Sequence, residues 1–425
     1  MDTAQAPKTE SILRYLAVAA LVAASAWLVR LPGTEDVSVF WLPWTGLMQE
    51  HGWIQGYAAA HSDYPPGAFL FLHLVGQLSA HTGIGNALLL KIALAGCALA
   101  NAAILLLWRR NFWVTVAFAF ALLLNSAAHG YLDTVWLPPL LLCLWALESG
   151  RLTAAGVLFA LSVLIKWQPV LLAPFLAMHA ARVYRGDPTP FASRVSAIAR
   201  ALAGALVVTV PVFLVIPPAE ILKAFALARQ HPGLSYQALN VNWIIQQIQY
   251  QQAGHAGSGL LPFLQGLPHP LMVWPRRIFY LLFALLLFVQ FWRGGSYRGF
   301  LWYALTGFLT YCTVNNGVHE NHLFLVMALA FVIAAHTPPS AWLVAGFAAL
   351  TTNVNLFVFY GLDGNSSFYR PPYTSARLNE FLLGWSALNF VFFVLCWVQC
   401  LRGSLRAGSA QLPAPDSPAT ASKRS

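Results

Sequence analysis

Long runs of hydrophobic residues, separated by short polar connections, dominate this chain of 425 residues. Most runs come close to the roughly 20 residues that an α-helix needs to cross the hydrocarbon of a bilayer. They lack the strict alternation of apolar and polar positions that is typical of membrane β-barrel strands. The pattern therefore predicts an all-α fold, a polytopic membrane bundle of about twelve transmembrane helices. The predicted spans are 12–31, 86–108, 112–127, 131–148, 152–166, 168–184, 200–217, 278–293, 299–314, 321–336, 341–359 and 380–401.

The composition also predicts a membrane protein and does not alter the predicted fold. Hydrophobic residues make up 58% of the chain and charged residues 9%, which leaves too little polar surface to cover a soluble globule. The five cysteines all fall inside predicted spans, so we expect core residues and not a disulfide framework. The net charge of +10 does not predict a nucleic-acid partner, because the basic residues follow the predicted membrane topology.

Basic residues gather in the short connections on one side of the predicted bundle. These residues are Arg109, Arg110, Arg151, Arg182, Arg185, Arg194, Arg293, Arg298, Arg402 and Arg406. Short loops rich in Lys and Arg stay in the cytoplasm, so both termini are predicted to be cytoplasmic. Most histidines and acids fall on the opposite side. We therefore expect a multi-pass protein of the inner cell membrane with its titratable chemistry on the non-cytoplasmic side.

Two predicted outer segments, residues 32–85 and 218–277, are too long to be simple turns. In the first, apolar and aromatic residues recur at helical spacing from Val37 to Met48, which predicts an interfacial helix with its aromatic side in the headgroups and a kink at Pro43. A second interfacial helix is expected over 68–78. The spans and loops form one predicted domain, residues 1–402, with the site in the two long loops. The Ser-, Ala- and Pro-rich tail 403–425 is predicted to be a disordered cytoplasmic segment.

The first long loop carries four candidate site residues. Glu35 and Asp36 stand side by side just after the first predicted span. A carboxylate at the edge of a bilayer is either solvated or part of a site, because its transfer into hydrocarbon is costly. Asp63 and Tyr64 lie in the sequence HSDYPPG, where the two prolines hold Tyr64 extended. This arrangement suits a site wall, and a rigid turn between two surface helices is the alternative.

Two further segments sit at predicted outer ends of spans. The sequence HGYLDT at 129–134 contains Asp133, and LIKWQPVLL at 164–172 contains Lys166 and Gln168. In one interpretation, Lys166 and Asp133 neutralise one another at the interface. In another, the charged side chain of Lys166 points at a phosphate or a sugar hydroxyl of a ligand. A lysine that extends its charge to the interface is a third interpretation.

The sequence NNGVHENHLFL at 315–325 places His319, Glu320 and His322 within four positions at the start of a span. Free backbone N–H groups and the helix dipole favour an anion or proton-transfer site there. Histidines that are merely satisfied at the interface are the alternative. The spacing is not the i, i+4 pair of a helical zinc site, so no metal is predicted.

The second long loop combines amides with aromatic rings in GLSYQALNVNW at 233–243. Amides can hydrogen-bond sugar hydroxyls and aromatic faces can stack on a sugar ring, which makes Asn240 and Trp243 candidates. Arg276 and Arg277 precede the next span. The two guanidinium groups suit a lipid phosphate, with ordinary headgroup binding as the alternative.

In their order along the chain, these segments resemble the GT-C glycosyltransferases, which take a sugar from a polyprenyl-phosphate carrier on the outer or lumenal side. The first-loop pattern D-x-x-x-F-x-x-W is met at Asp36 and Phe40, but Trp44 lies one place late. The segment Ser235 to Trp243 is similar to the S-x-N-A-x-N-x-W pattern of bacterial relatives of the second mannosyltransferase of GPI-anchor synthesis, with Gln237 replacing the first Asn. Relatives often carry Arg or Lys where this chain has Asn321.

The resemblance implies an inverting transfer of a hexose, with mannose expected, from a polyprenyl-phosphate donor to a hydroxyl of a glycan, lipid or protein acceptor. Asp36 would be the general base, Glu35 would orient it or simply face water, and no cofactor is implied. Lys166, Arg276, Arg277 or His322 would hold the donor phosphate. Two rivals stay open: a flippase or transporter of lipid-linked glycans, and a transferase of the O-antigen ligase type.

Overall fold

The computed structural model describes residues 6–229, 233–252, 269–337, 340–364 and 376–402. Of the described residues, 83% are helical, which confirms the predicted all-α class. The first part of the chain forms α1 (Ala6–Leu28), η1 (Val37–Trp41), α2 (Leu42–Ala60), α3 (Pro66–Thr82), α4 (Asn86–Arg109), α5 (Phe112–Leu122), η2 (Leu123–Ala128), α6 (Asp133–Glu148), α7 (Leu152–Ile165), η3 (Gln168–Leu172), α8 (Ala173–Ala180) and α9 (Phe191–Val215). The predicted tail 403–425 lies outside the described residues.

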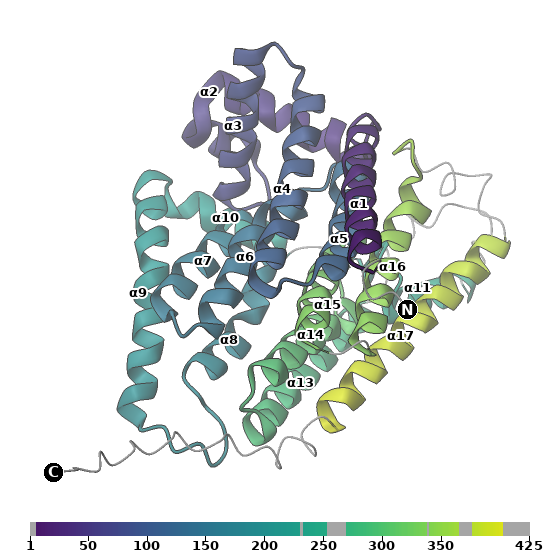
Figure 1. The fold of residues 1–425 in the computed structure, drawn as a ribbon. Coiled ribbons are helices and arrows are strands. Elements are labelled where there is room, and N and C mark those ends of the chain that lie inside the picture. The colour runs from purple at the N-terminus through teal and green to yellow at the C-terminus, as the bar shows by residue number, and fades with distance from the viewer. Residues whose placement is uncertain (1–5, 230–232, 253–268, 338–339, 365–375, 403–425) are drawn as a thin grey trace.

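The second part of the chain forms another set of helices and one very small sheet. Its elements are α10 (Pro218–Ala228), β1 (Ser235–Tyr236), α11 (Val241–Gln252), α13 (His269–Arg293), α14 (Tyr297–Val314), β2 (Val318–His319), η5 (Glu320–Leu323), α15 (Phe324–His336), α16 (Ser340–Tyr360) and α17 (Ala376–Arg402). In Figure 1, α9 and α17 lie at opposite edges of the bundle, and α2 and α3 project together beyond it.

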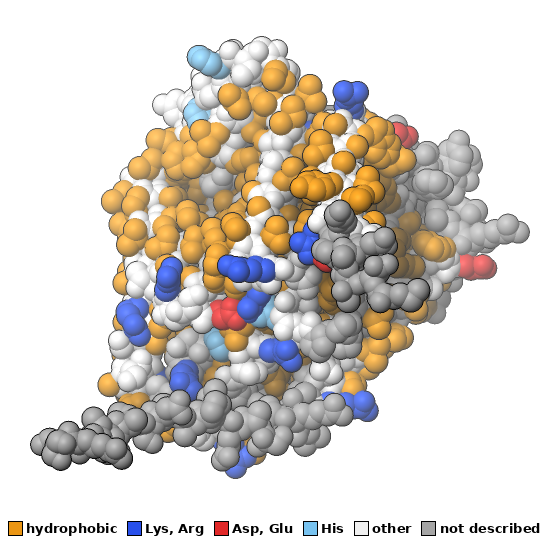
Figure 2. Space-filling view, viewed as in Figure 1, with side chains coloured by type: hydrophobic (Ala, Val, Ile, Leu, Met, Phe, Trp, Pro, Cys, Tyr) orange, Lys and Arg blue, Asp and Glu red, His pale blue; other side chains and the backbone are white. Residues whose placement is uncertain are grey.

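Within the described ranges, six helices are long and apolar enough to cross a membrane, namely α1, α4, α9, α13, α16 and α17. Four shorter apolar helices cover 112–128, 152–165, 168–180 and 320–336. Each predicted span overlaps a helix of the structure, and their number as membrane crossings stays a prediction. The long helices leave many aliphatic side chains exposed, such as Leu206 and Leu214 on α9. Figure 2 shows hydrophobic side chains over much of this face, as expected where helices meet lipid.

The core is centred on α15, which is buried along almost its whole length from Phe324 to Ala334. A helix that is apolar on all sides belongs inside a large bundle. Helices α14 and α16 pack against α15, and α14 is buried over most of its own length. The segment before α15 carries Glu320, so this buried helix fixes the position of that carboxyl.

The first long loop forms two helices, as predicted, but two details differ. The backbone leaves the helical conformation at Gly52, with φ 71° and ψ 174°, and not at Pro43. Pro43 lies in the first turn of α2, directly after η1, and the residues before it, Trp41 and Leu42, keep a helical backbone. The aromatic side faces outward only in part, because Phe40 is 42% exposed whereas Trp41 is 1% exposed and packs edge-on against Tyr64 at 5.2 Å between ring centroids.

Polar contacts divide the helix ends into two groups. At one end, Trp108 donates to Glu148 at 2.7 Å, and Arg298 donates to the carbonyl of His336 at 2.9 Å. These residues close α4, α6 and α15 and open α14, beside the Arg-rich connections. The starts of α6 and α15 and the end of α16 meet at the other end through Asn321 to Asp133 and Tyr360 to Glu320. The predicted site residues belong to this second end.

Candidate functional site

A cavity of about 760 Å³ lies at this second end of the bundle. The first long loop, the end of α7, α10, the β1 strand, the start of α13 and the segment before α15 all contribute to its wall. Its polar lining comprises Asp36, His61, Ser62, Asp63, Lys166, Gln168, Arg229, Gln237, Arg276, Asn315, Asn316, His319, Glu320, Asn321 and His322. Residues far apart in the sequence therefore line one cavity.

The tiny sheet joins the second long loop to the His-Glu segment. Strands β1 and β2 pair in parallel, with Ser235 opposite Val318 and Tyr236 opposite His319. The ring of Tyr236 stacks on His319, with centroids 4.7 Å apart and planes at 7°. Gly317 has a φ of +70°, and its N–H donates to the carbonyl of Gly233 at 3.0 Å. This pairing fixes both segments against the cavity.

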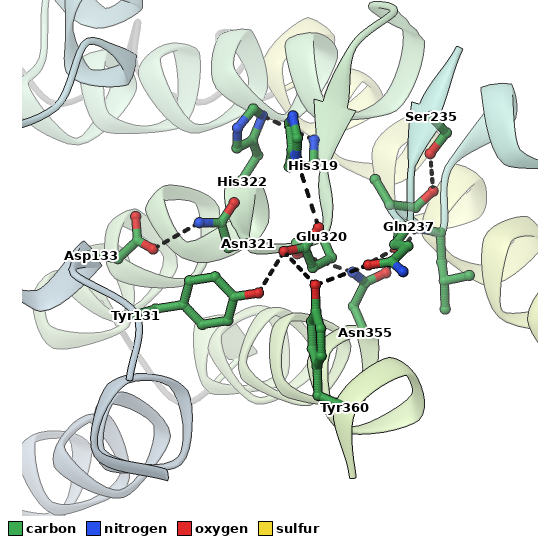
Figure 3. A network of polar contacts seen from close by, with 12 residues as sticks. Tyr131, Asp133, Ser235, Gln237, His319, Glu320, Asn321, His322, Asn355 and Tyr360 are labelled. Carbon is green, nitrogen blue, oxygen red and sulfur yellow. Dashed lines mark hydrogen bonds and ion pairs between the residues drawn. The ribbon is translucent and has the colours of Figure 1, made fainter. Parts of the chain in front are cut away.

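Glu320 is the centre of a hydrogen-bond network that Figure 3 shows. The hydroxyl of Tyr131 donates to Glu320 Oε1 at 2.5 Å, and that of Tyr360 donates to the same oxygen at 3.3 Å. His319 Nδ1 lies 3.9 Å from Glu320 Oε2. The side chain of Asn355 donates to the Glu320 carbonyl at 3.0 Å. Helix α16, the turn before α6 and the strand β2 thus hold one buried carboxyl at the cavity wall.

A buried ion pair stands beside this network. Lys166 Nζ lies 2.7 Å from Asp133 Oδ1, and the Asp133 side chain is fully buried. Trp136 Nε1 donates to Oδ1 at 3.1 Å and Asn321 Nδ2 donates to Oδ2 at 3.2 Å, so both oxygens have partners. The interpretation that Lys166 and Asp133 neutralise one another is confirmed. Asp133 lies behind the wall, whereas Lys166 also lines the cavity, 5.4 Å from the centre of the Tyr64 ring.

Asp36 reaches the cavity from the turn between α1 and α2. Its pKa is raised to about 7, first because burial disfavours the charged carboxylate and then because the negative charge of Glu320 adds to the effect. The positive charge of Lys166 opposes this rise. A carboxyl with a pKa near 7 can take up and release a proton near neutral pH. Glu35, its neighbour, is exposed and does not line the cavity.

Buried contacts attach the turn that carries Asp36 to the start of α6. Thr34 N–H donates to the carbonyl of His129 at 2.8 Å. Lys91, which is 2% exposed, donates to the carbonyls of Leu31 at 2.6 Å and Ala128 at 2.7 Å. These bonds hold residues 128–129, which lie just before Tyr131 and Asp133, next to the loop that leads to Asp36.

Aromatic rings form the wall beside Asp63 and Tyr64. Trp44 lies 5.3 Å from Trp41 and 6.0 Å from Tyr64 between ring centroids. Trp167 Nε1 donates to the carbonyl of Asp63 at 2.8 Å, which fixes this turn against the end of α7. Asp63 and Tyr64 both line the cavity, in the place that the sequence suggested for them. Aromatic pairs at these separations are rigid as well as apolar.

Another part of the wall is apolar, adjoins Trp167 through Phe225 at 5.3 Å between ring centroids, and borders the outer surface of the bundle. It consists of Val170, Leu171, Phe225, Leu227, Phe279 and Tyr280. Phe225 and Tyr280 are themselves exposed, and Leu222 and Leu281 on the same two helices are 62% and 70% exposed. The apolar wall of the cavity is therefore continuous with apolar faces on α10 and α13.

Two arginines line the cavity close to this apolar part. Arg276 Nε donates to Asn316 Oδ1 at 3.3 Å, and Arg229 lies 5.8 Å from the centre of the Phe225 ring. Neither forms an ion pair with an acid among the residues that the structure describes, in contrast to Lys166. Their charge is thus available for an anionic ligand.

The structure brings nine of the predicted site residues to the cavity and leaves five away from it. Those at the wall are Asp36, Asp63, Tyr64, Lys166, Gln168, Arg276, His319, Glu320 and His322. Glu35 is exposed away from the cavity, and Asp133 is buried behind the cavity wall. Arg277 is exposed and packs over the ring of Trp274 at 5.4 Å, outside the cavity.

Asn240 and Trp243 require a correction, because they do not face the cavity as sugar-binding residues would. Asn240 Nδ2 donates to the carbonyl of Cys312 at 2.8 Å, and its Oδ1 accepts from Trp243 N–H at 3.0 Å. The Trp243 ring is 2% exposed and packs against Phe359 at 5.5 Å. Both residues begin and anchor α11 on α14 and α16.

Three residues of the cavity wall, Arg229, Gln237 and Tyr360, were not predicted from the sequence, and neither was Tyr131, which lies behind the wall and bonds Glu320. Tyr131 lies in the HGYLDT segment, where Asp133 alone was singled out. Tyr360 ends a predicted span with no motif around it, and Arg229 follows an apolar helix. Gln237 was noted only as a departure from a family pattern. Its position at the wall depends on β1 pairing with β2.

Comparison with known proteins adds no identification. No protein-family model matches the chain, and no curated protein sequence is significantly similar to it. Among the described residues, no group of three His, Cys, Asp or Glu side chains is placed to hold a metal ion.

Proposed function

We propose that this chain is a membrane glycosyltransferase of the GT-C type that transfers a hexose from a polyprenyl-phosphate carrier to an acceptor hydroxyl. The observation that carries the proposal is the composition of one cavity. It joins Asp36, with a pKa near 7, to two arginines that form no ion pair with the described acids, and to an apolar wall that meets an exposed apolar surface. A lipid-linked sugar phosphate needs each of these three features.

The proposed reaction uses Asp36 as the general base. The carboxylate takes the proton of the acceptor hydroxyl while its oxygen attacks the anomeric carbon, and the bond from that carbon to the phosphate oxygen breaks. The leaving phosphate keeps the electron pair and needs no general acid. Arg276 and Arg229 stabilise its charge. A glycosidase would instead need two carboxyl groups acting across the bond.

The proposed orientation puts the cavity on the non-cytoplasmic side of the inner membrane, with twelve helices crossing it. In support, the Arg-rich connections lie at the opposite ends of the helices from the cavity. Figure 2 shows Lys and Arg side chains gathered in the lower part of the face it views, below the broad hydrophobic area. Positive residues of short loops mark the cytoplasmic side.

The direct test is a transfer assay. Purified protein in lipid is incubated with radiolabelled polyprenyl-phosphate mannose or glucose and an extract of membrane acceptors. We expect label to move from the carrier to an acceptor. Movement of lipid-linked glycan across vesicles without transfer would favour a transporter instead, and transfer only from a pyrophosphate-linked glycan would favour a ligase of the O-antigen type.

Arg276 is expected to bind the donor phosphate. Removing a charge-assisted contact should weaken donor binding by roughly ten- to a hundredfold, or about 1.5–3 kcal/mol. Arg276→Ala and Arg277→Ala form a matched pair, since the residues are adjacent but only Arg276 lines the cavity. Donor affinity measured on both variants tests the assignment. Equal affinities in the two variants would move the phosphate to another cation.

The pH dependence of transfer should report the charge state of Asp36. Because its pKa is raised to about 7, the carboxylate form accumulates only above that pH, so kcat/KM should rise through pH 7 and then level off. Glu320 contributes to the raised pKa, and Glu320→Gln removes that negative charge. The rising limb should therefore move to lower pH. A limb that stays in place, or that moves equally in the exposed control Glu50→Gln, would contradict the coupling.

A further inference from the structure

Gln237 holds an unusual backbone conformation at the cavity wall. Its φ is +62°, in the left-handed region that residues with a side chain rarely adopt. The other described residues of this kind, glycines aside, are His61, Arg110 and Arg182, and each ends a helix, where that conformation is routine. Gln237 instead follows the strand β1.

Several contacts maintain this conformation. Asn355 Nδ2 donates to the Gln237 carbonyl at 3.1 Å, and Gln237 forms a backbone bridge with His319. The Tyr360 hydroxyl lies 3.0 Å from Gln237 Oε1 and 3.3 Å from Glu320 Oε1. Figure 3 shows the amide of Gln237 and the carboxyl of Glu320 on either side of that hydroxyl. Backbone strain that is held by so many contacts is typical of functional positions.

The amide keeps one polar group for a ligand. Tyr360 has a single O–H, and it satisfies only one end of the Gln237 amide. The other end has no hydrogen-bond partner among the described residues, and Gln237 lines the cavity. A hydroxyl both donates and accepts, so it fits this remaining group in either orientation of the amide.

Asparagine would suit the backbone better than glutamine does. Asn is enriched among residues in the left-handed region, whereas Gln is not. The extra methylene of Gln lets the amide reach Tyr360, which lies on α16, more than 100 residues away. The longer side chain thus has a role in the cavity that outweighs its backbone cost.

Resting on the proposed function, we infer that Gln237 is a specificity-determining residue, which hydrogen-bonds a hydroxyl of the sugar carried by the donor lipid. The Tyr360 contact positions the amide, and Glu320 fixes Tyr360 in turn. The bond discriminates a polyprenyl-phosphate hexose from the same lipid without its sugar. It makes no contact with the phosphate, which the arginines hold.

The test compares Gln237→Asn with wild type in two measurements. Affinities for polyprenyl-phosphate mannose, polyprenyl-phosphate glucose and bare polyprenyl phosphate are measured in nanodiscs, together with the melting temperature. We expect the variant to bind at least one hexose lipid about three- to tenfold more weakly, with unchanged binding of the bare phosphate. Its melting temperature should be equal or higher, because the backbone strain is relieved. Gln77→Asn, on the exposed face of α3, is the matched control and should bind as wild type does.

Two results would overturn the inference. If Gln237→Asn keeps the wild-type preference for both hexose lipids over the bare lipid, Gln237 does not contact the sugar. If its melting temperature falls, weaker binding would reflect damage to the fold. A wild-type protein that binds neither hexose lipid would overturn the proposed function itself, and this inference with it. The result on wild type therefore tests the proposed function, and the result on the variant tests the role of Gln237.

Discussion

Asp36→Asn is expected to lower turnover by about 10² to 10⁴, the range typical of losing a general base. The substitution keeps the shape of the side chain and its hydrogen-bonding reach but removes the proton acceptor. Donor binding should survive, since Arg276 and Arg229 and not Asp36 face the phosphate in the proposed site. Turnover and donor affinity, both measured in the same lipid, check the prediction.

Glu35→Gln is the matched control for this change. Glu35 is adjacent in sequence and of the same charge, but it is exposed and lies away from the cavity wall. Its replacement should leave turnover close to that of wild type. Near-normal turnover in Asp36→Asn would remove Asp36 as the base. A collapse confined to Glu35→Gln would instead assign the role one residue earlier.

The helical architecture could be predicted because its signal is local. Runs of apolar residues define each helix, and Pro, Gly and Arg mark most of its ends. Helices α2 and α3 in the first long loop were predicted for the same reason. Its packing was not, because the pattern from Val37 to Met48 marks an apolar face but not what covers it. Here α3 covers much of it, through Trp44 against Phe69 at 5.0 Å.

Most charged residues of the site could be predicted from the sequence. Uncharged residues such as Tyr131 and Tyr360 could not, because only the fold brings them to the site. Acids, histidines and basic residues are rare in an apolar chain, so the residue types of Asp36, Lys166 and Glu320 alone made them site candidates. Tyr131 and Tyr360 are aromatic residues among many. Their roles come from bonds to Glu320 across 189 and 40 positions. No local pattern encodes such contacts.

Asn240 and Trp243 show the converse error. Amides and aromatic rings bind sugars, but they also end loops and fill cores, and the sequence does not separate these uses. Asn240 accepts from the backbone N–H three residues later, a bond typical of residues that begin helices. Asn and Trp near a helix start are thus weak evidence for a ligand. Gln237, in the same segment, is distinguished only by its backbone conformation.

The ion pair of Lys166 and Asp133 explains how a cavity with several charges is held together inside an apolar bundle. Lys166 lies at the end of α7 and Asp133 at the start of α6, so the pair links two of the closely packed helices. Asn321 extends the link to the segment that carries Glu320. A change here should therefore affect the stability of the whole polar end.

Lys166→Met should destabilise the protein by about 3–5 kcal/mol, because it leaves a fully buried carboxylate without its counter-charge. Lys223→Met is the matched control, since that lysine lies 3.9 Å from Glu220 but is largely exposed, where ion pairs contribute little. Adding Asp133→Asn to Lys166→Met should recover much of the loss, because the neutral amide keeps an acceptor for Trp136 without a buried charge. Thermal unfolding of the four proteins, wild type included, in one lipid preparation measures these effects. If Lys166→Met unfolds as wild type does, or if the double variant is less stable than the single one, the buried charge is not what Lys166 compensates.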